Sequence, residues 1–358
     1  MLQNFPGIYI HVPFCLKKCA YCAFYSLENF SKYNEYCKAI QRDIDFICHF
    51  AYDTKPDTLY WGGGTPSLLK EHELATWMQQ LTNTFTFQEV TMEVNPSSMT
   101  QEKCKFYRSI GIQRISIGIQ SLDDQVLQFL GRLHTAKQAK QVIQQVQSTF
   151  ENFSLDLIYA IPQVSSQIIY TTLQQMVENF QPPHISTYPL EIYSHTLLGK
   201  KNLQSSEEQF SKEYEWIHQY LQSQGYIHYE VSNFCKKDFQ ALHNSKYWKC
   251  IPYWGLGPSA HSLWNHRRFS YKDIQHYIEQ DLQNLYENAL PLSPQDMHEE
   301  QIMLVARTLQ GIPRFQCSIT DERLQFLIKQ NLLSLENQQI YIQPQGWQVL
   351  NSLIVELL

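Results

Sequence analysis

The alternation of strand-like and helix-like segments between residues 7 and 190 is the feature that most constrains the fold of this chain. Runs with the composition of strands occur at Gly7–Val12, Thr58–Trp61, Val90–Val94, Arg114–Ile119, Ser154–Tyr159 and Ile185–Leu190. The segments between them, 32–50, 71–84, 100–109, 123–147 and 167–179, have helical apolar periodicity. Strands that alternate with helices pair in parallel through right-handed crossovers. We therefore expect an α/β fold, an incomplete (β/α)6 TIM-like barrel, with a doubly wound sheet as the alternative.

The polar and glycine residues of this region cluster where the predicted strands end. In (β/α) barrels, the loops at the carboxyl ends of the strands converge over the barrel mouth, so these residues predict one site at that rim. From the first strand to the sixth, they are a cysteine loop, Gly62-Gly63-Gly64-Thr65-Pro66, Glu93-Val94-Asn95-Pro96, Gln120, Asp156 and Pro189-Leu190-Glu191.

The cysteine loop after the first strand has the spacing CxxxCxxC, formed by Cys15, Cys19 and Cys22. Three close thiolates can hold three corners of an iron–sulfur cube, whose fourth site is normally completed by another thiolate. No cysteine follows at the usual short spacing, which would leave one iron open to an exchangeable ligand. A zinc site with His11 as fourth ligand and a set of inert buried thiols are the alternatives.

Two acidic residues, Glu93 and Asp156, lie within apolar strand segments. A buried carboxylate is costly unless it meets a cation or a hydroxyl, and a sulfonium cofactor with an amino group and a ribose offers both. For Asp156, a salt bridge inside the barrel is an equally good explanation. Arg132 could be a solvated charge at a helix end, and the three consecutive glycines could be a loose turn.

Charge and composition exclude several functional classes. The net charge of −6 over 358 residues argues against a general binder of nucleic acid or membrane surfaces. No stretch approaches twenty apolar residues, and no secretory signal is visible at the N-terminus. The odd number of cysteines, nine, fits a reducing compartment, so we expect a cytoplasmic protein without a membrane span.

Beyond residue 200 the alternation stops, and we divide the chain into a barrel (1–200), an extension (201–291) and a C-terminal domain (292–358). The extension is predicted to be α+β and begins with a helix over 205–224. A proline-rich break at Pro291-Leu292-Ser293-Pro294 marks the second boundary. We expect the C-terminal domain to be small, mostly helical and winged-helix-like. Its predicted elements are helices at 296–309 and 321–333, a strand at Ile340–Ile342 and a closing helix at Gly346–Leu357.

Several motifs together resemble a known family. They are Tyr9-Ile10-His11-Val12-Pro13-Phe14-Cys15, Trp61-Gly62-Gly63-Gly64-Thr65-Pro66, Ser116-Ile117-Gly118-Ile119-Gln120-Ser121 and Asp156-Leu157-Ile158-Tyr159. With these motifs, the chain resembles the oxygen-independent coproporphyrinogen III oxidase (HemN-like) superfamily of radical S-adenosylmethionine (SAM) proteins, over nearly its whole length. Within that superfamily it resembles the HemW haem chaperones.

The resemblance implies a set of cofactor ligands. Cys15, Cys19 and Cys22 would bind a 4Fe-4S cluster. At the positions where the oxidases contact the cluster-bound SAM, this chain has Tyr9, Gly63, Glu93, Leu190 and His261. At the positions where the oxidases contact a second SAM, it has Tyr21, Gly64, Thr65, Gln120, Arg132 and Asp156.

Two features count against the oxidase. The oxidases have CxxxCxxCxC, whereas Phe24 stands at the last position here, and they carry a long N-terminal extension, whereas only eight residues precede Tyr9 here. His243-Asn244-x-x-Tyr247-Trp248 also matches the HNxxYW signature of the HemW group, and Tyr229-Glu230-Val231-Ser232-Asn233-Phe234 is similar to its YEISN(F/Y) segment. Ala23 departs from the aspartate that this group often has.

The sequence therefore predicts a haem-binding protein that delivers haem to an acceptor, with an oxidase that decarboxylates coproporphyrinogen III as the alternative. His243 could be the haem ligand, because neutral imidazole is a common axial ligand of haem iron. A hydrogen-bonded core histidine is the competing interpretation. The catalytic residues, the acceptor, the electron donor, the cleavage of SAM and the oligomeric state are left open.

Overall fold

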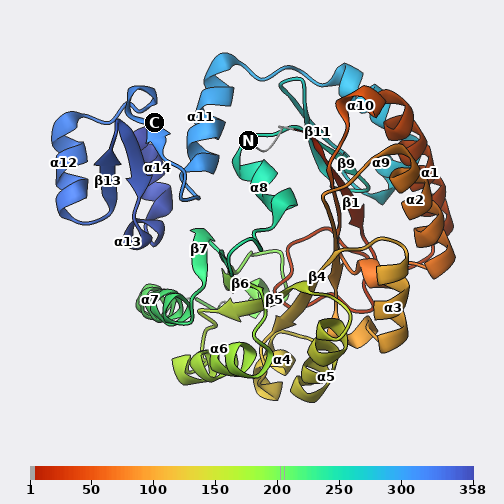
Figure 1. Ribbon diagram of the computed structural model, residues 1–358, viewed down its shortest axis with the longest axis horizontal. Coiled ribbons are helices and arrows are strands. Elements are labelled where there is room, and N and C mark those ends of the chain that lie inside the picture. The colour runs from red at the N-terminus through yellow and green to blue at the C-terminus, as the bar shows by residue number, and fades with distance from the viewer. Residues whose placement is uncertain (1–4, 202, 205) are drawn as a thin grey trace.

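In the computed structural model, which describes all residues except 1–4, 202 and 205, the N-terminal half forms the expected row of parallel strands. The register of each pair is parallel, and the order along the sheet is β1-β2-β3-β4-β5-β6. Helices α1 to α6 cover the outside of this curved sheet (Figure 1). The strands are β1 Gly7–Val12, β2 Thr58–Gly63, β3 Glu89–Val94, β4 Arg114–Gln120, β5 Asn152–Tyr159 and β6 His184–Pro189. The helices are α1 Tyr33–Phe50, α2 Glu71–Thr84, α3 Gln101–Ser109, α4 Asp124–Phe129, α5 Ala136–Gln147 and α6 Ser166–Phe180.

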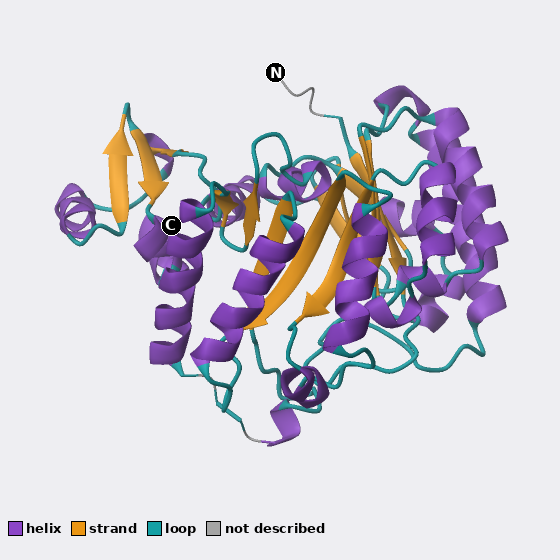
Figure 2. Cartoon of the chain, turned by 60° about the horizontal axis from the view of Figure 1, so that its bottom comes forward, coloured by secondary structure: helices purple, strands orange, loops and turns teal. Residues whose placement is uncertain are grey.

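The incomplete barrel is therefore confirmed, with one difference among its helices. The segment 123–147, which has continuous helical periodicity, is broken into α4 and α5. Gly131 interrupts it with a φ of +75°, and Thr135 then starts a new helix through a capping box with Gln138. The apolar core lies between the strands and the outer helices, where Ile8, Ile10, Leu59 and Trp61 are fully buried. Figure 2 shows the strands and the helices outside them with the bottom of Figure 1 turned toward the viewer.

The segment after residue 206 adds strands to both edges of this sheet rather than forming a sheet of its own. β9 pairs in parallel with β1, and β8 pairs antiparallel with β6, so that the full order is β11-β10-β9-β1-β2-β3-β4-β5-β6-β8-β7. These strands were not expected from periodicity. The elements of this segment are α7 Glu207–Ser223, β7 Ile227–Glu230, β8 Asn233–Cys235, α8 Leu242–Trp248, β9 Tyr253–Leu256, β10 His261–Trp264, β11 Arg267–Ser270, α9 Ile274–Glu279 and α10 Leu282–Asn288.

The predicted helix over 205–224 is observed as α7; Ser205 itself lies outside the described residues. Helix α8 occupies the amino-terminal ends of the barrel strands. The backbone N–H groups of Leu242 and His243 both donate to the carboxylate of Glu89, the first residue of β3, at 2.9 Å. The helix therefore closes the end of the barrel that lies opposite the cysteine loop.

The C-terminal segment forms a small, mostly helical unit around a three-stranded antiparallel sheet, ordered β12-β14-β13. It lies beside the barrel, at the left in Figure 1. The predicted helix over 321–333 ends earlier, and Leu333 instead starts a strand. The elements are α11 Pro294–Val305, β12 Ile312–Pro313, α12 Asp321–Lys329, β13 Leu333–Glu336, β14 Gln339–Ile342, α13 Pro344–Trp347 and α14 Leu350–Leu357. Short 3-10 helices occur at Tyr52–Thr54, Pro66–Leu68, Pro96–Ser98, Gly199–Lys201 and Arg314–Gln316.

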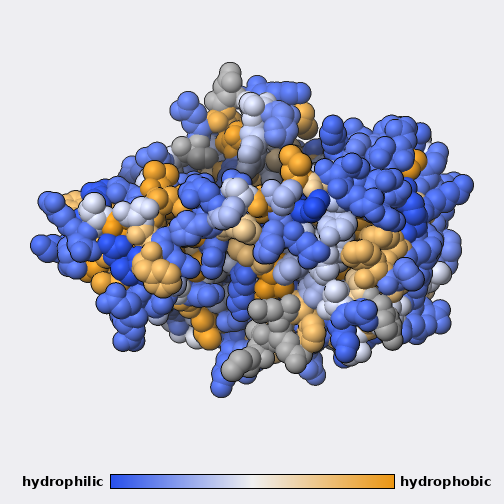
Figure 3. Space-filling model, turned by 90° about the horizontal axis from the view of Figure 1, so that it is seen from above, coloured by the Kyte–Doolittle hydropathy of each residue, from blue (hydrophilic) through white to orange (hydrophobic). Residues whose placement is uncertain are grey.

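The division of the chain at residues 200 and 291 into separate domains stays a prediction. None of the helices in the described residues is long and apolar enough to cross a membrane. On the face of the molecule shown in Figure 3, hydrophilic residues predominate and the hydrophobic residues form small, separate patches.

Candidate functional site

A cavity of about 1190 Å³ opens at the carboxyl ends of the barrel strands. Its volume exceeds the roughly 300–1,000 Å³ that is usual for one small-molecule ligand. It reaches from the cysteine loop, across the strand ends, to α7 and the C-terminal unit. Twelve of the fifteen predicted site residues line it: Cys15, Cys19, Tyr21, Cys22, Gly63, Gly64, Thr65, Glu93, Gln120, Arg132, Asp156 and Leu190.

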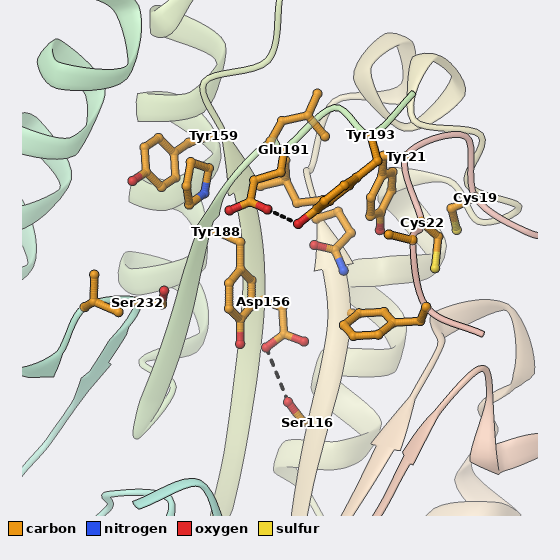
Figure 4. A pocket seen from close by; sticks show the side chains of 18 of the residues that line it. Cys19, Tyr21, Cys22, Ser116, Asp156, Tyr159, Tyr188, Glu191, Tyr193 and Ser232 are labelled. Carbon is orange, nitrogen blue, oxygen red and sulfur yellow. Dashed lines mark hydrogen bonds between the residues drawn. The ribbon is translucent and has the colours of Figure 1, made fainter. Parts of the chain in front are cut away.

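Backbone contacts hold the cysteine loop in place over the barrel mouth. The N–H of Cys15 donates to the carbonyl of Leu27 (3.0 Å), and the N–H of Ala20 donates to the carbonyl of Leu130 (3.0 Å). The N–H of Leu198 donates to the carbonyl of Ala20 (2.9 Å). The loop is thereby fixed to segments that follow β1, β4 and β6. Figure 4 shows Cys19, Tyr21 and Cys22 side by side along it.

The three thiols suit a cluster better than a single zinc ion. Among the described residues, no three His, Cys, Asp or Glu side chains are gathered closely enough to hold one metal ion, whereas the corners of a cube are ligated separately. His11 is not placed as a fourth zinc ligand, because its Nε2 lies 2.8 Å from the carbonyl of Tyr25 and its Nδ1 lies 3.0 Å from the hydroxyl of Tyr9. Burial raises the pKa of Cys15 and raises that of Cys22 to about 11, so metal must displace protons there.

The glycines after β2 let the chain pass close to the cysteine loop. Gly63 has a φ of +108°, which a side chain rarely adopts. A Cβ on Gly64 would lie 2.8 Å from the carbonyl oxygen of Phe14 and 3.0 Å from Sγ of Cys15. The next residue, Thr65, donates its hydroxyl to the same sulfur at 3.5 Å. This close approach, rather than a loose turn, explains the glycine run.

Glu93 lies at the end of β3, facing the cavity. Its Oε1 accepts a hydrogen bond from the hydroxyl of Tyr60 (2.7 Å), and its Oε2 accepts one from the backbone N–H of Gly63 (3.1 Å). Burial, assisted by the charge of Asp156, raises the pKa of Glu93 to about 7. A cation in the cavity would therefore stabilise the ionised form of this carboxyl group.

Asp156 of β5 belongs to the same acidic part of the cavity. It accepts a hydrogen bond from the hydroxyl of Ser116 at 3.3 Å, drawn in Figure 4. Burial raises the pKa of Asp156 to about 6. Among the described residues, Asp156 has no salt bridge to a barrel lysine or arginine, the alternative that the sequence left open.

Gln120 and Arg132 also line the cavity. Gln120 has a φ of +67° at an irregularity of the β4–β5 pairing, and its buried Oε1 has no hydrogen-bond partner among the described residues. A strained residue with an orphaned polar atom is typical of a ligand contact. Nη1 of Arg132 donates to Sγ of Cys19 at 3.3 Å. Arg132 is therefore not a solvated helix-end charge; it lies beside the cysteine loop.

The three other predicted residues lie elsewhere. Tyr9 is inside the barrel, next to His11, and His261 is the exposed first residue of β10. His243 is fully buried at the opposite end of the barrel. Its Nδ1 lies 2.9 Å from the hydroxyl of Thr58, and its Nε2 lies 2.8 Å from that of Tyr247. An iron could reach a ring nitrogen only by displacing one of these partners.

Two tyrosines of the cavity wall, Tyr188 and Tyr193, were not predicted from the sequence, whereas their neighbour Glu191 was expected at the rim. Tyr188 is the penultimate residue of β6, and Glu191 and Tyr193 follow that strand. Figure 4 shows Glu191 and Tyr193 joined by a hydrogen bond. The position of both tyrosines at the end of a barrel strand was a usable signal. Nothing in the sequence signalled that the C-terminal unit also contributes, with lining residues Gln345, Trp347, Gln348, Val349, Leu350, Asn351 and Ser352.

Comparisons with known proteins agree with this architecture. The sequence model of the Radical SAM superfamily matches residues 9–176. The haem chaperone HemW of Lactococcus lactis is 29% identical, over 100% of this chain and 98% of its own. HemW of Escherichia coli is 33% identical, over 71% of this chain and 69% of its own.

Among solved structures, coproporphyrinogen III oxidase (HemN) from Escherichia coli, a radical SAM enzyme, is similar with a TM-score of 0.80. The match covers 99% of this chain and 90% of that one, at 18% identity, and it shows a shared fold. Radical SAM proteins use a 4Fe-4S cluster and SAM, and the thiols, carboxylates and unpartnered amide of the cavity fit both groups. This chain belongs to the HemW family of radical SAM proteins.

Proposed function

We propose that the protein is a haem chaperone, which binds haem as cargo and delivers it to an acceptor protein. The similarity of the whole chain to HemW of Lactococcus lactis carries this proposal. The exposed Phe24, where the related oxidases have a further cysteine, supports it. The nine cysteines are all free, which supports a reducing, cytoplasmic location.

In this proposal, Cys15, Cys19 and Cys22 would hold the 4Fe-4S cluster, which in its bound and reduced state would offer an electron donor beside SAM. The carboxylates of Glu93 and Asp156 attract the cationic part of SAM. Gly63 and Gly64 bring bare backbone close to it, and Gln120 offers its unpartnered Oε1. Arg132 stabilises the thiolate of Cys19 through its hydrogen bond.

Tyr9, His261 and Leu190 remain proposed contacts of the first SAM, and Tyr21 and Thr65 of a second. Of these, Leu190, Tyr21 and Thr65 line the cavity. For Tyr9 and His261 the support is the family resemblance alone. The burial of His243 and its two hydrogen bonds favour a structural role over iron ligation.

The proposal is tested on protein with a reconstituted cluster, in two parallel assays. Haem is titrated into the protein and followed by absorbance, and coproporphyrinogen III is incubated with the protein, SAM and a reductant under nitrogen. Saturable haem binding without formation of protoporphyrinogen supports the chaperone. Formation of protoporphyrinogen without haem binding would instead establish the oxidase.

A further inference from the structure

Three segments of the chain meet at Ala20, in the middle of the cysteine loop. The N–H of Ala20 donates to the carbonyl of Leu130 at 3.0 Å, and its carbonyl accepts from the N–H of Leu198 at 2.9 Å. The segments are the cysteine loop itself and the stretches that follow β4 and β6. None of them contains an aspartate or a glutamate, although the whole chain has 34 acidic residues and a net charge of −6. Their ranges are 13–27, 125–134 and 192–201.

The same three segments carry positive charge. Besides Arg132, which donates to Cys19, they hold four lysines that we call the basic collar: Lys17, Lys18, Lys200 and Lys201. Among the described residues, none of these lysines forms an ion pair. An acidic side chain does reach the loop, because Glu28 accepts a hydrogen bond from the backbone N–H of Lys18 at 2.7 Å. Four lysines against one glutamate leave the collar with an excess of positive charge.

Local contacts hold two collar lysines beside the loop. Nζ of Lys18 donates to the carbonyl of Phe24 at 2.9 Å, a neutral partner that leaves the ammonium charge uncompensated. Nζ of Lys201 lies 5.9 Å from the centre of the Phe129 ring, next to the residue that binds Ala20. The stretch after β6 is therefore fixed to the stretch after β4 by a side chain as well as through the cysteine loop.

Apolar side chains are exposed among these charges. Leu16, Leu133 and Leu197 are 56%, 47% and 56% exposed. Leu16 and Leu133 line one shallow hollow together with Lys17 and Cys19. Exposed apolar side chains with a charged rim are typical of a surface that binds another protein.

The position of this surface indicates the kind of partner. Cys19 lines both the shallow hollow and the main cavity, and it is a proposed cluster ligand. A protein docked on the hollow would therefore be separated from the cluster by little more than one side chain. Complexes that transfer electrons have small interfaces, and charge complementarity steers their association. A basic surface is the complement of an acidic carrier.

We propose that the basic collar, with Leu16, Leu133 and Leu197, docks an acidic one-electron carrier protein that reduces the cluster. The reduced carrier loses one electron and the oxidised cluster gains it, so that no bond forms or breaks. The inference rests on the cluster at the cysteine loop and goes beyond the chaperone function, because it does not depend on the cargo.

Binding is tested on cluster-free protein, with oxidised flavodoxin as the acidic probe and calorimetry as the readout. The affinity is expected to fall with added salt, which screens exposed charges. The double variant Lys200→Glu/Lys201→Glu should bind roughly tenfold or more weakly at low salt. Lys249→Glu/Lys329→Glu changes the net charge equally at two exposed lysines away from the loop, and should bind as wild type does.

Reduction is tested on cluster-loaded protein, mixed rapidly with flavodoxin in its hydroquinone form. The Lys200→Glu/Lys201→Glu variant should be reduced roughly tenfold or more slowly than the control variant at low salt. Dithionite needs no docking surface and should reduce both at the same rate. Leu133→Ser removes apolar contact without a change of charge, and should slow reduction by flavodoxin while its salt dependence is kept.

Three results would overturn the proposal. They are a wild-type reduction rate that does not respond to salt, equal rates in the collar and control variants, and collar-dependent binding to phosphatidylserine vesicles without binding to flavodoxin. Failure of the chaperone function is separate. Protein that binds no haem but is reduced by flavodoxin in a collar-dependent way would contradict that function and support the docking surface.

Discussion

The guanidinium of Arg132 donates a hydrogen bond from Nη1 to Sγ of Cys19 over 3.3 Å, although the two residues are 113 positions apart. The contact joins the loop after β1 to the segment between α4 and α5. It places a fixed positive charge beside a proposed cluster ligand, and hydrogen bonds to sulfur are one means by which proteins set the potential of such clusters.

Replacing Arg132 with alanine is expected to make the cluster harder to reduce and faster to lose iron. A charge-assisted hydrogen bond contributes about 1.5–3 kcal/mol, so the midpoint potential should fall by tens of millivolts. The measurement is a redox titration followed by electron paramagnetic resonance, with iron release to a chelator as a second readout. Arg108→Ala, an exposed position on α3, is the control, and equal potentials in both variants would contradict the assignment.

Gly64→Ala is expected to disturb the cluster without unfolding the barrel. The added Cβ would lie 2.8 and 2.9 Å from the carbonyl oxygens of Phe14 and Val12 and 3.0 Å from Sγ of Cys15, so the backbone that carries Cys15 must shift. Reconstituted protein should retain less iron and sulfide per chain than wild type. Gly111→Ala adds a methyl group at a φ of +94°, where Cε of Met78 lies at an ordinary contact distance of 3.9 Å, and should cost about 1 kcal/mol of stability while its iron content stays normal.

SAM binding is expected to tighten as pH rises through neutrality and to release protons. The pKa of Glu93 is raised from 4.5 to about 7. Between these values the folded protein therefore holds more protons on this group than the unfolded chain does. Its contribution to stability is thus present at low pH and is lost as pH rises through that window. A cationic ligand reverses the preference, because it favours the ionised carboxylate.

Below pH 7, the affinity for SAM should increase by up to roughly tenfold for each unit of increase in pH, because binding releases the proton of Glu93. Calorimetry in buffers of different ionisation enthalpy measures the proton release directly. Glu93→Gln should flatten the pH dependence. A flat profile in the wild type would show that Glu93 does not meet the cation.

His243→Ala is expected to destabilise the fold. The ring is fully buried, and its loss would leave the hydroxyls of Thr58 and Tyr247 without this partner. A cost of about 2–5 kcal/mol follows from comparable core truncations, and chemical denaturation would measure it. Per folded molecule, haem affinity should match that of wild type. Normal stability with lost haem binding would contradict the structural role.

The sequence predicted the barrel well because its six strands and outer helices are local patterns, and the rim could be placed because parallel strands end together. Glu93, Asp156 and the three cysteines meet for that reason. The strands β7 to β11 are short, and the pairing of β9 with β1 and of β8 with β6 depends on contacts between distant segments, which periodicity does not report.

The role of His243 shows the same limit. The HNxxYW motif marks α8, but the motif does not tell which end of the barrel the helix covers. The six-residue strand β2 spans roughly 17–20 Å, and its first residue, Thr58, contacts His243 while its last, Gly63, lines the cavity. The contribution of Trp347 to the cavity likewise depends on how the C-terminal unit packs against the barrel.

The central claim is that this protein carries haem and gives it up. The most direct measurement loads cluster-reconstituted protein with haem, removes free haem by gel filtration, and adds excess apomyoglobin as an acceptor. Haem is expected to stay with the protein through the column and then to appear in myoglobin, as followed by absorbance. Elution of the protein without haem, or haem that never leaves it, would contradict a chaperone function.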